Sequence, residues 1–502
     1  MKLTLQKTTL AVCTALLVGS TFSCREELLS PTPQTQFSPQ IVYANPARIA
    51  LEVNGLYSYV KVGNFLGGRA QIYGDIRAND FINKTNNAVT GLTVWNHTET
   101  ETSQNDVINM WGAAYAAINQ VNVFLAGLDA NAASFVAPTF PSDYATTANQ
   151  YRGEARLLRA LSYYTLLQFY ARPYVDGAGA KPGLPLRLKA ENSLGGNNLA
   201  RSTVAQVYAQ IIDDLNFAEQ NLPLTYTGSS ASTLNVTRAH RNTAIALKTR
   251  VYLTMGRYSD VVTEANKIVP AAAPYAASTG VANALNSSIT NVFAVPQETT
   301  ESILSFPFSA QDTPGTQNQL AYYYLPGSAG GNGEYNINSA AGGILANPGF
   351  ATTDVRRGPN FLVVSNSESF LRKYPTGTPF TDKAPVIRYA EVLLSLAEAR
   401  VRGSNTVDAQ SLALLNAVRT RSNPAGAYTA ASFASASAFI DAVLLERRIE
   451  FLGEGIRNID IMRLNATIPE KGPVKEVPPS STLYVWPIPS SELLTNSDIT
   501  RN

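Results

Sequence analysis

Helical spacing of apolar residues recurs along most of this 502-residue chain and constrains its fold more than any other feature. In several segments apolar side chains return every three or four residues, which is the pattern of one buried helix face. Thr203 stands where an N-cap is expected, and Pro223 ends the segment that follows it. The periodic segments are 106–125, 150–171, 203–222, 241–254, 258–268, 385–401, 409–420 and 439–452. Helices joined by short connections favour antiparallel pairs, so the sequence predicts a mainly α scaffold of stacked helix pairs.

Residues 270–384 interrupt this pattern, because they are rich in Gly, Pro, Ser, Asn and Tyr and hold only short apolar stretches. Such composition predicts loops with a few strands. Binding residues in proteins lie disproportionately on loops that a rigid scaffold positions. We therefore expect one domain over residues 41–502, with loop-rich, ligand-facing insertions near 66–104 and 270–384.

The first residues have the composition of an export signal. Lys2 and Lys7 precede a nine-residue apolar run from Leu10 to Val18, which is too short to span a bilayer. Cleavage after residue 23 would leave Cys24 at the N-terminus, where bacteria attach lipid. The sequence predicts a lipoprotein signal peptide at 1–23, lipidation of Cys24 and a Pro-rich tether over 24–40. An ordinary secretory leader with a chance cysteine is the alternative.

Composition excludes several classes of protein. Cys13 lies in the leader and Cys24 would be acylated, so the mature chain has no thiol for a disulfide, a metal site or a nucleophile. Removing the two leader lysines from the 39 basic residues leaves 37 against 37 acidic ones, which gives no attraction for nucleic acid. His97 and His240 lack metal-ligand spacing, and no cofactor-binding or catalytic motif is present. We expect no metal, no cofactor and no catalytic residues.

Polar and aromatic residues in the first insertion suit sugar binding. Aromatic rings stack on the apolar faces of sugars, while amides and carboxylates bind hydroxyl groups. The candidate contacts here are Asp75, Asn79, Asp80, Trp95 and Asn96. The competing interpretation is a loop whose tryptophan is tucked into the core.

Tyrosines in the long insertion form a second candidate group. Tyr322, Tyr323 and Tyr324 precede a glycine-rich run, and Tyr335 follows it. Three adjacent side chains cannot all point one way, so one or two of the three should be core residues.

A charged block near the C-terminus, residues 446–463, is threaded with apolar residues. Gly453 and Gly455 should end its helix. Glu454, Arg457, Asp460 and Arg463 follow three residues apart and can pair. The pattern is typical of a clasp between helices and only weakly of a ligand site.

This block, LLERRIEFLGEGIRNIDIMRLN from Leu444, resembles the C-terminal signature of the SusD/RagB family of outer-membrane nutrient-binding lipoproteins. GEARLLRALSYYTLLQFYARPYV from Gly153 and STVAQVYAQIIDDLNFAEQNLP from Ser202 are similar to the family's second and third helices. Further matches follow in order, at ALKTRVYLTMGRYSD, IRYAEVLLSLAEA, LLNAVRTRS and the closing VWPIPSSELLTNSDITRN.

The resemblance implies a tetratricopeptide-like helix-pair scaffold that is lipid-anchored on the outer face of the outer membrane. It also implies a SusC-like TonB-dependent transporter as partner and an oligosaccharide as ligand, or a peptide in some branches. Family members bind rather than cleave, so the expectation is a protein that is not an enzyme. A surface glycosidase remains the rival function, because pairs of carboxylates are common in this chain.

Overall fold

The computed structural model describes residues 39–193 and 195–502. The expected signal peptide, the lipidated Cys24 and nearly all of the tether lie outside these described residues. Among the described residues, no helix combines the length and apolar character that crossing a membrane requires.

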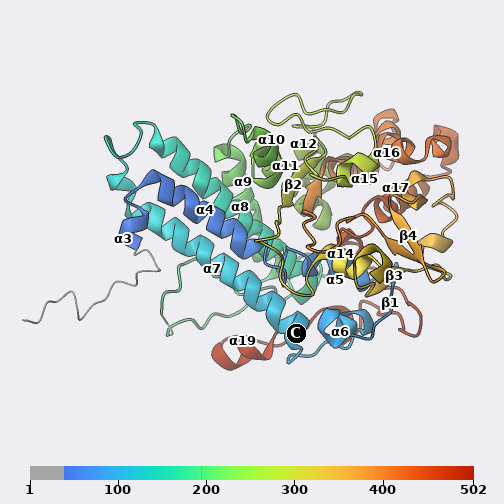
Figure 1. Ribbon diagram of the computed structural model, residues 1–502, viewed down its shortest axis with the longest axis horizontal. Coiled ribbons are helices and arrows are strands. Elements are labelled where there is room, and N and C mark those ends of the chain that lie inside the picture. Colours follow the sequence, from blue (N-terminus) through green and yellow to red (C-terminus); the bar gives the residue numbers. More distant parts are fainter. Residues whose placement is uncertain (1–38, 194) are drawn as a thin grey trace, which may run out of the picture.

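Helices make up the body of the molecule, which confirms the prediction of a mainly α fold (Figure 1). The N-terminal half contains α3 (Pro39–Val42), α4 (Pro46–Val60), α5 (Arg69–Ile76), α6 (Leu92–Asn96), α7 (Asn109–Ala130), α8 (Tyr144–Tyr170), α9 (Val204–Asn221), α10 (Ala231–Thr237), α11 (Arg241–Thr254) and α12 (Tyr258–Ala265). The rest adds α13 (Ile289–Phe293), α14 (Leu320–Tyr324), α15 (Tyr389–Ser404), α16 (Ala409–Ser422), α17 (Ala436–Glu450), α18 (Ile456–Arg463) and α19 (Ser490–Thr495). Long α7 and α8 run side by side, and the helices from α9 onward continue the stack.

The helix starts follow from local chemistry. Thr203 caps α9 as expected, accepting a hydrogen bond from the backbone N–H of Gln206, whose side chain returns to the N–H of Thr203. Asn45 caps α4, a helix that the periodicity analysis missed.

One predicted helix begins later than expected. The segment 385–401 was expected to be helical throughout, but Ala384–Arg388 is strand β6 and α15 starts at Tyr389. Pro385 has no N–H to donate, and the strand is apolar enough to lie fully buried against its partner.

Three two-stranded antiparallel sheets lie in or beside the loop-rich insertion. Strand β1 (Phe81–Asn83) pairs with β3 (Tyr335–Ile337), β2 (Ser302–Phe306) with β6, and β4 (Leu362–Ser365) with β5 (Glu368–Leu371). The first sheet matters most for function, because it joins the two insertions near 66–104 and 270–384.

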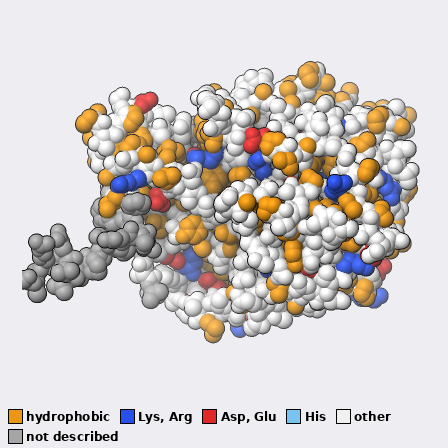
Figure 2. All heavy atoms as spheres, viewed as in Figure 1, with side chains coloured by type: hydrophobic (Ala, Val, Ile, Leu, Met, Phe, Trp, Pro, Cys, Tyr) orange, Lys and Arg blue, Asp and Glu red, His pale blue; other side chains and the backbone are white. Residues whose placement is uncertain are grey.

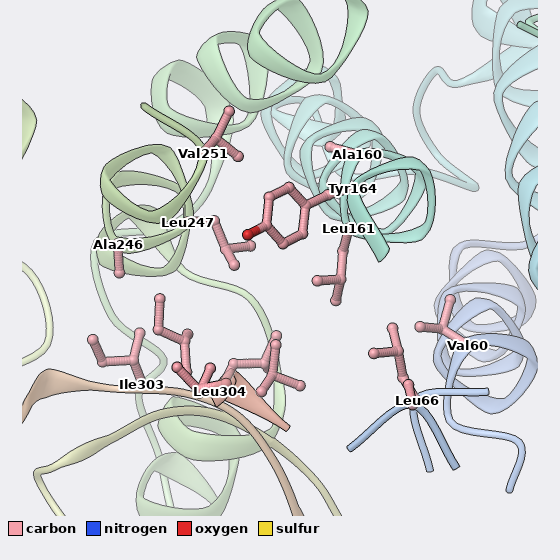
Figure 3. Packing of buried hydrophobic residues seen from close by; sticks show 14 of the residues in the cluster. Val60, Leu66, Ala160, Leu161, Tyr164, Ala246, Leu247, Val251, Ile303 and Leu304 are labelled. Atoms are coloured by element: carbon pink, nitrogen blue, oxygen red, sulfur yellow. The ribbon is translucent and has the colours of Figure 1, made fainter. Parts of the chain in front are cut away.

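The hydrophobic core lies where helices of the scaffold meet strand β2. Leu161 and Tyr164 of α8 face Leu247 and Val251 of α11, with Ile303 and Leu304 of β2 closing the far side (Figure 3). Close-packed apolar contacts of this kind stabilise the fold, and residues 39–193 and 195–502 contain no cysteine that could form a disulfide.

The charged block 446–463 forms the clasp that its pattern indicated. Asp460 pairs with Arg463 at 2.8 Å, as the spacing predicts, and also with Arg447 at 2.9 Å. Glu454 instead pairs with Arg388 at the end of β6 at 2.7 Å and with Lys373 of the insertion at 2.9 Å. A buried ion cluster thus joins the insertion to α16 and α17; its members are Glu301, Asp354, Arg356, Lys373, Arg388, Arg419, Arg421, Glu446, Glu450 and Glu454.

Candidate functional site

Strands β1 and β3 bring the two predicted groups of site residues together. Their register places Asn83 opposite Tyr335 and Phe81 opposite Ile337. The ring of Phe81 lies 5.0 Å from that of Tyr324. Strands β1 and β3, which lie more than two hundred residues apart in the chain, therefore join the two insertions into one structural unit.

The acidic and amide candidates of the first insertion are bound to protein groups. Asp75 accepts hydrogen bonds from the Tyr324 hydroxyl at 3.1 Å and from the Gly455 N–H at 3.0 Å. Burial raises the pKa of Asp75 well above its usual range, while these two donors act in the opposite direction. Asn79 donates to the Gly342 carbonyl at 2.8 Å, and Asp80 is paired with Arg448 at 2.5 Å.

The aromatic candidates support the same unit from inside. The indole N–H of Trp95 donates to the Phe81 carbonyl at 3.0 Å, and the Tyr335 hydroxyl donates to the Thr90 carbonyl at 3.0 Å. The rings of Tyr323 and Tyr335 are stacked 6.2 Å apart. As expected for three adjacent tyrosines, two of them, Tyr323 and Tyr324, are core residues.

Seven of the nine predicted contact residues are thus buried: Asp75, Asn79, Asp80, Trp95, Tyr323, Tyr324 and Tyr335. Their side chains cannot meet a ligand in this conformation, and they hold the loops in place instead. Only Asn96 and Tyr322 are partly exposed. For Trp95 the structure corresponds to the alternative of a tryptophan tucked into the core.

The surface above this support is a rim made of residues 84–90, 327–333 and 376–380 together with Tyr322, most of them exposed or half-buried. Buried Glu334 ties the first two loops together, because its carboxylate accepts hydrogen bonds from Thr85, Thr90 and Asn332. The solvent-facing amides and hydroxyls of these two loops are therefore held in fixed positions by the buried residues beneath them.

Tyr322 is the aromatic centre of the rim. Its ring lies 6.0 Å from that of half-buried Phe380, and its hydroxyl accepts a hydrogen bond from Gln317 at 3.4 Å. Phe380 and Gln317 both have positive φ, of 61° and 59°, an uncommon conformation for such residues that recurs at binding sites. Helical periodicity predicts neither residue, and the Gly377-Thr-Pro turn before Phe380 is the one signal in the sequence.

Models of known families match almost the whole of the described chain. Residues 56–253 match a model described as starch-binding and associating with the outer membrane, and residues 248–502 match the model of the SusD family. The chain belongs to the SusD family.

Solved structures share the fold of this SusD-family protein. A SusD superfamily protein from Bacteroides fragilis superposes with a TM-score of 0.79 at 32% identity, covering 91% of this chain and 100% of that one. Surface glycan-binding protein A from Bacteroides uniformis reaches a TM-score of 0.70 at 20% identity, covering 91% and 99%. The SusD-like protein P38 of Formosa agariphila is 22% identical over 474 residues, 86% of each chain.

Two open grooves of the SusD-family protein lie away from the rim. One of about 330 Å³ lies between α7 and α19, where Arg187 is already paired with Glu191 and Glu492. The other, of about 640 Å³, lies beside α9, α11 and α12, where Lys248 and Lys267 are paired with Glu219 and Glu264. Because their charged groups already have protein partners, the rim is the better candidate site.

In the part of the chain that the structure describes, no group of three or more His, Cys, Asp or Glu residues is placed to hold a metal ion.

His97 closes the end of α6 beneath Trp95 and is buried. Its ring nitrogen Nε2 lies 3.3 Å from the ammonium of Lys471, which also donates to the carbonyls of Ile76 and Arg77. Burial lowers the pKa of His97 to about 2, and the positive charges of Lys471 and Arg77 add to this effect. The imidazole is therefore neutral at every physiological pH.

The free energy of unfolding of this SusD-family protein should fall as the pH is lowered, because His97 is protonated much more readily in the unfolded chain than in the folded one. The unfolded chain protonates this histidine near pH 6.5 and the folded chain only near 2, so the stability that His97 contributes is lost as pH falls below about 6.5. We expect His97→Asn, which tolerates the local φ of 54°, to reduce the stability difference between about pH 7 and about pH 4.5 by up to about 3 kcal/mol. Urea unfolding of both proteins at the two pH values measures this. An unchanged pH dependence in the variant would contradict the assignment.

Proposed function

We propose that this SusD-family protein is a non-catalytic surface lipoprotein that captures oligosaccharides and delivers them to a SusC-like TonB-dependent transporter. In this proposal residues 1–23 are a cleaved signal peptide, Cys24 carries lipid, and residues 24–40 tether a single domain of residues 41–502. The domain faces the cell exterior from the outer membrane. The transporter supplies the uptake energy, so this chain needs affinity rather than a reaction centre.

Family membership supports carbohydrate as the ligand class. The model matched by residues 56–253 is described as starch-binding, and two of the structural relatives are described as a SusD-like carbohydrate-binding protein and a surface glycan-binding protein. The observation that carries the proposal in this chain is the rim, where the exposed part of Tyr322 stands among solvent-facing amides and hydroxyls. That combination suits stacking on sugar rings together with hydrogen bonds to their hydroxyls.

At the level of residues, we propose Tyr322 and Asn96 as direct contacts. The seven buried candidates, Asp75, Asn79, Asp80, Trp95, Tyr323, Tyr324 and Tyr335, act by fixing the position of the rim. Phe380 and Gln317 orient the Tyr322 ring.

Tyr322→Ala is expected to weaken binding of the preferred oligosaccharide about tenfold, because it removes a stacking ring while leaving the buried support in place. The ligand is first found by screening the purified protein against a glycan library, and affinity is then measured by calorimetry. Tyr258→Ala is a matched control, since this half-buried tyrosine lies on α12 of the helical scaffold. Its affinity should equal that of the wild type.

The same screen tests the rival functions. Retention of a glycan without cleavage products supports the proposal. Release of shortened products would indicate a glycosidase, and binding of peptides in preference to every glycan would change the ligand class.

A further inference from the structure

The loop that joins α7 to α8, residues 131–143, presents an uncharged apolar tip to solvent. No Asp, Glu, Lys or Arg occurs from Asn131 to Ser142. Val136 is 60% exposed, and its neighbours Ala137 and Pro138 are exposed as well. Figure 2 shows apolar side chains at this end of the molecule.

A rigid aromatic base holds this tip in place. The rings of Phe135, Phe140 and Tyr144 contact one another, with centroids between 4.7 and 5.4 Å apart. The N–H of Phe140 donates to the Val136 carbonyl at 3.1 Å, which closes the loop on itself. The loop conformation therefore keeps Val136 exposed, because it buries the ring of Phe140 and leaves the side chain of Val136 on the outside.

Helix α3, with which the described structure begins, lies at the same end of the molecule as this loop (Figure 1). Tyr43, just after α3, donates to the Phe124 carbonyl at 3.2 Å and lies against Gly127 of α7. The amide of Asn131, the first residue of the loop, donates to the Gly127 carbonyl at 2.8 Å. Tyr43 and the first residue of the loop thus both contact the C-terminal part of α7.

Chain length limits how far this end can lie from the membrane. Fifteen residues, 24–38, separate the proposed lipid from the first described residue, and they span at most about 54 Å when fully extended. A lipid on Cys24 would therefore keep the end of the domain that carries the apolar tip within about 54 Å of the bilayer.

We propose that the tip of the 131–143 loop inserts into the interfacial region of the lipid bilayer as a second, non-covalent attachment. This inference rests on the lipidation of Cys24 proposed above and is independent of the glycan site. Apolar side chains buried in the membrane interface strengthen binding in proportion to their area, so the tip would add to the attachment that the lipid provides. Asp129 and Asp143 flank the tip at the helix ends, so insertion is shallow and leaves both carboxylates in water.

Depth-dependent quenching of tryptophan fluorescence tests this in the full-length lipidated protein. The three native tryptophans, Trp95, Trp111 and Trp486, are buried, so brominated acyl chains do not reach them and their emission is the same unquenched background in both variants. Val136→Trp protein is placed in phosphatidylcholine vesicles with or without brominated acyl chains. Leu494→Trp is the control, because Leu494 is 86% exposed on α19, away from the tether end (Figure 1).

Bromine is expected to quench the Val136→Trp protein about twofold more than the control, because only the loop tip reaches the acyl boundary. Equal quenching of the two variants, with mass spectrometry showing acyl chains on Cys24, would overturn the membrane contact while leaving the anchor intact. Absence of acyl chains would overturn both. Crosslinking of position 136 to a transporter barrel in cells, without quenching in vesicles, would assign the tip to a protein partner and also overturn the proposal. Glycan affinity of the same preparations reports separately on the proposed function.

Discussion

Arg388→Ala should lower the free energy of unfolding by about 3–5 kcal/mol, which is the usual cost of removing one partner from a buried ion cluster. Arg388 is fully buried, and its guanidinium donates to Glu454 at 2.7 Å and to Glu450 at 2.9 Å. It also binds Glu301. Alanine would leave three buried carboxylates with too few positive partners.

The wider cluster shows why this arginine matters. Burial opposes ionisation of Glu450, but Arg421, Arg388 and Arg356 together hold the pKa of its carboxyl below the usual value. The five acidic and five basic members of the cluster balance one another. Removing one arginine therefore leaves a net buried charge, whose effect reaches both the insertion and α17.

Denaturant unfolding followed by circular dichroism measures the loss. Arg257→Ala is the matched control, because Arg257 pairs with Asp260 at 2.7 Å on the surface and should contribute less than about 1 kcal/mol. Arg388→Lys is expected to fall between the two, since an ammonium keeps the charge but cannot bridge two carboxylates in the same geometry. Similar small losses for Arg388→Ala and Arg257→Ala would show that the cluster does not stabilise the fold.

Periodicity predicted the helical scaffold because each helix buries one face, and a buried face requires apolar residues every three or four positions in the local sequence. Thr203 and the spacing of Asp460 and Arg463 are further local signals that the structure confirms. The partners of Glu450 could not be predicted in this way. Arg356 and Arg388 lie 94 and 62 residues before it in the chain, and only the folded insertion brings them together.

The site was harder to predict than the fold, because residue type does not reveal which way a loop side chain points. Asp75 and Trp95 have the chemistry of sugar contacts, yet their polar atoms bind Gly455 and the Phe81 carbonyl inside the protein. The sequence placed candidate contacts in each of the two insertions, but it did not predict that β1 and β3 pair and so join the insertions. Phe380 was missed because its importance comes from its contact with Tyr322, 58 residues away.

Gly455→Ala should destabilise the protein by at least about 3 kcal/mol, because two costs add at this position. Gly455 has φ of 77°, which strains any side chain, and a Cβ there would lie 2.6 Å from the Gln71 Cα. Helices α5 and α18 meet here through their backbones, since a Cβ on Gly74 would in turn lie 2.4 Å from the Gly455 carbonyl oxygen. Separating them would also break the hydrogen bond from Gly455 to Asp75, which supports the rim through Tyr324.

The matched control is Gly112→Ala, at an exposed position within α7 where a Cβ meets nothing within 4 Å. Alanine there should stabilise the protein by about 0.5–1 kcal/mol, because glycine loses more conformational freedom in a helix. The same denaturant unfolding measures the change in the free energy of unfolding for both variants. A loss for Gly455→Ala and a gain for Gly112→Ala would distinguish the effect of the close backbone contact from the effect of helix propensity. If Gly455→Ala were neutral, the close contact between α5 and α18 would have to relax without cost, and the fixed base proposed for the rim would lose its support.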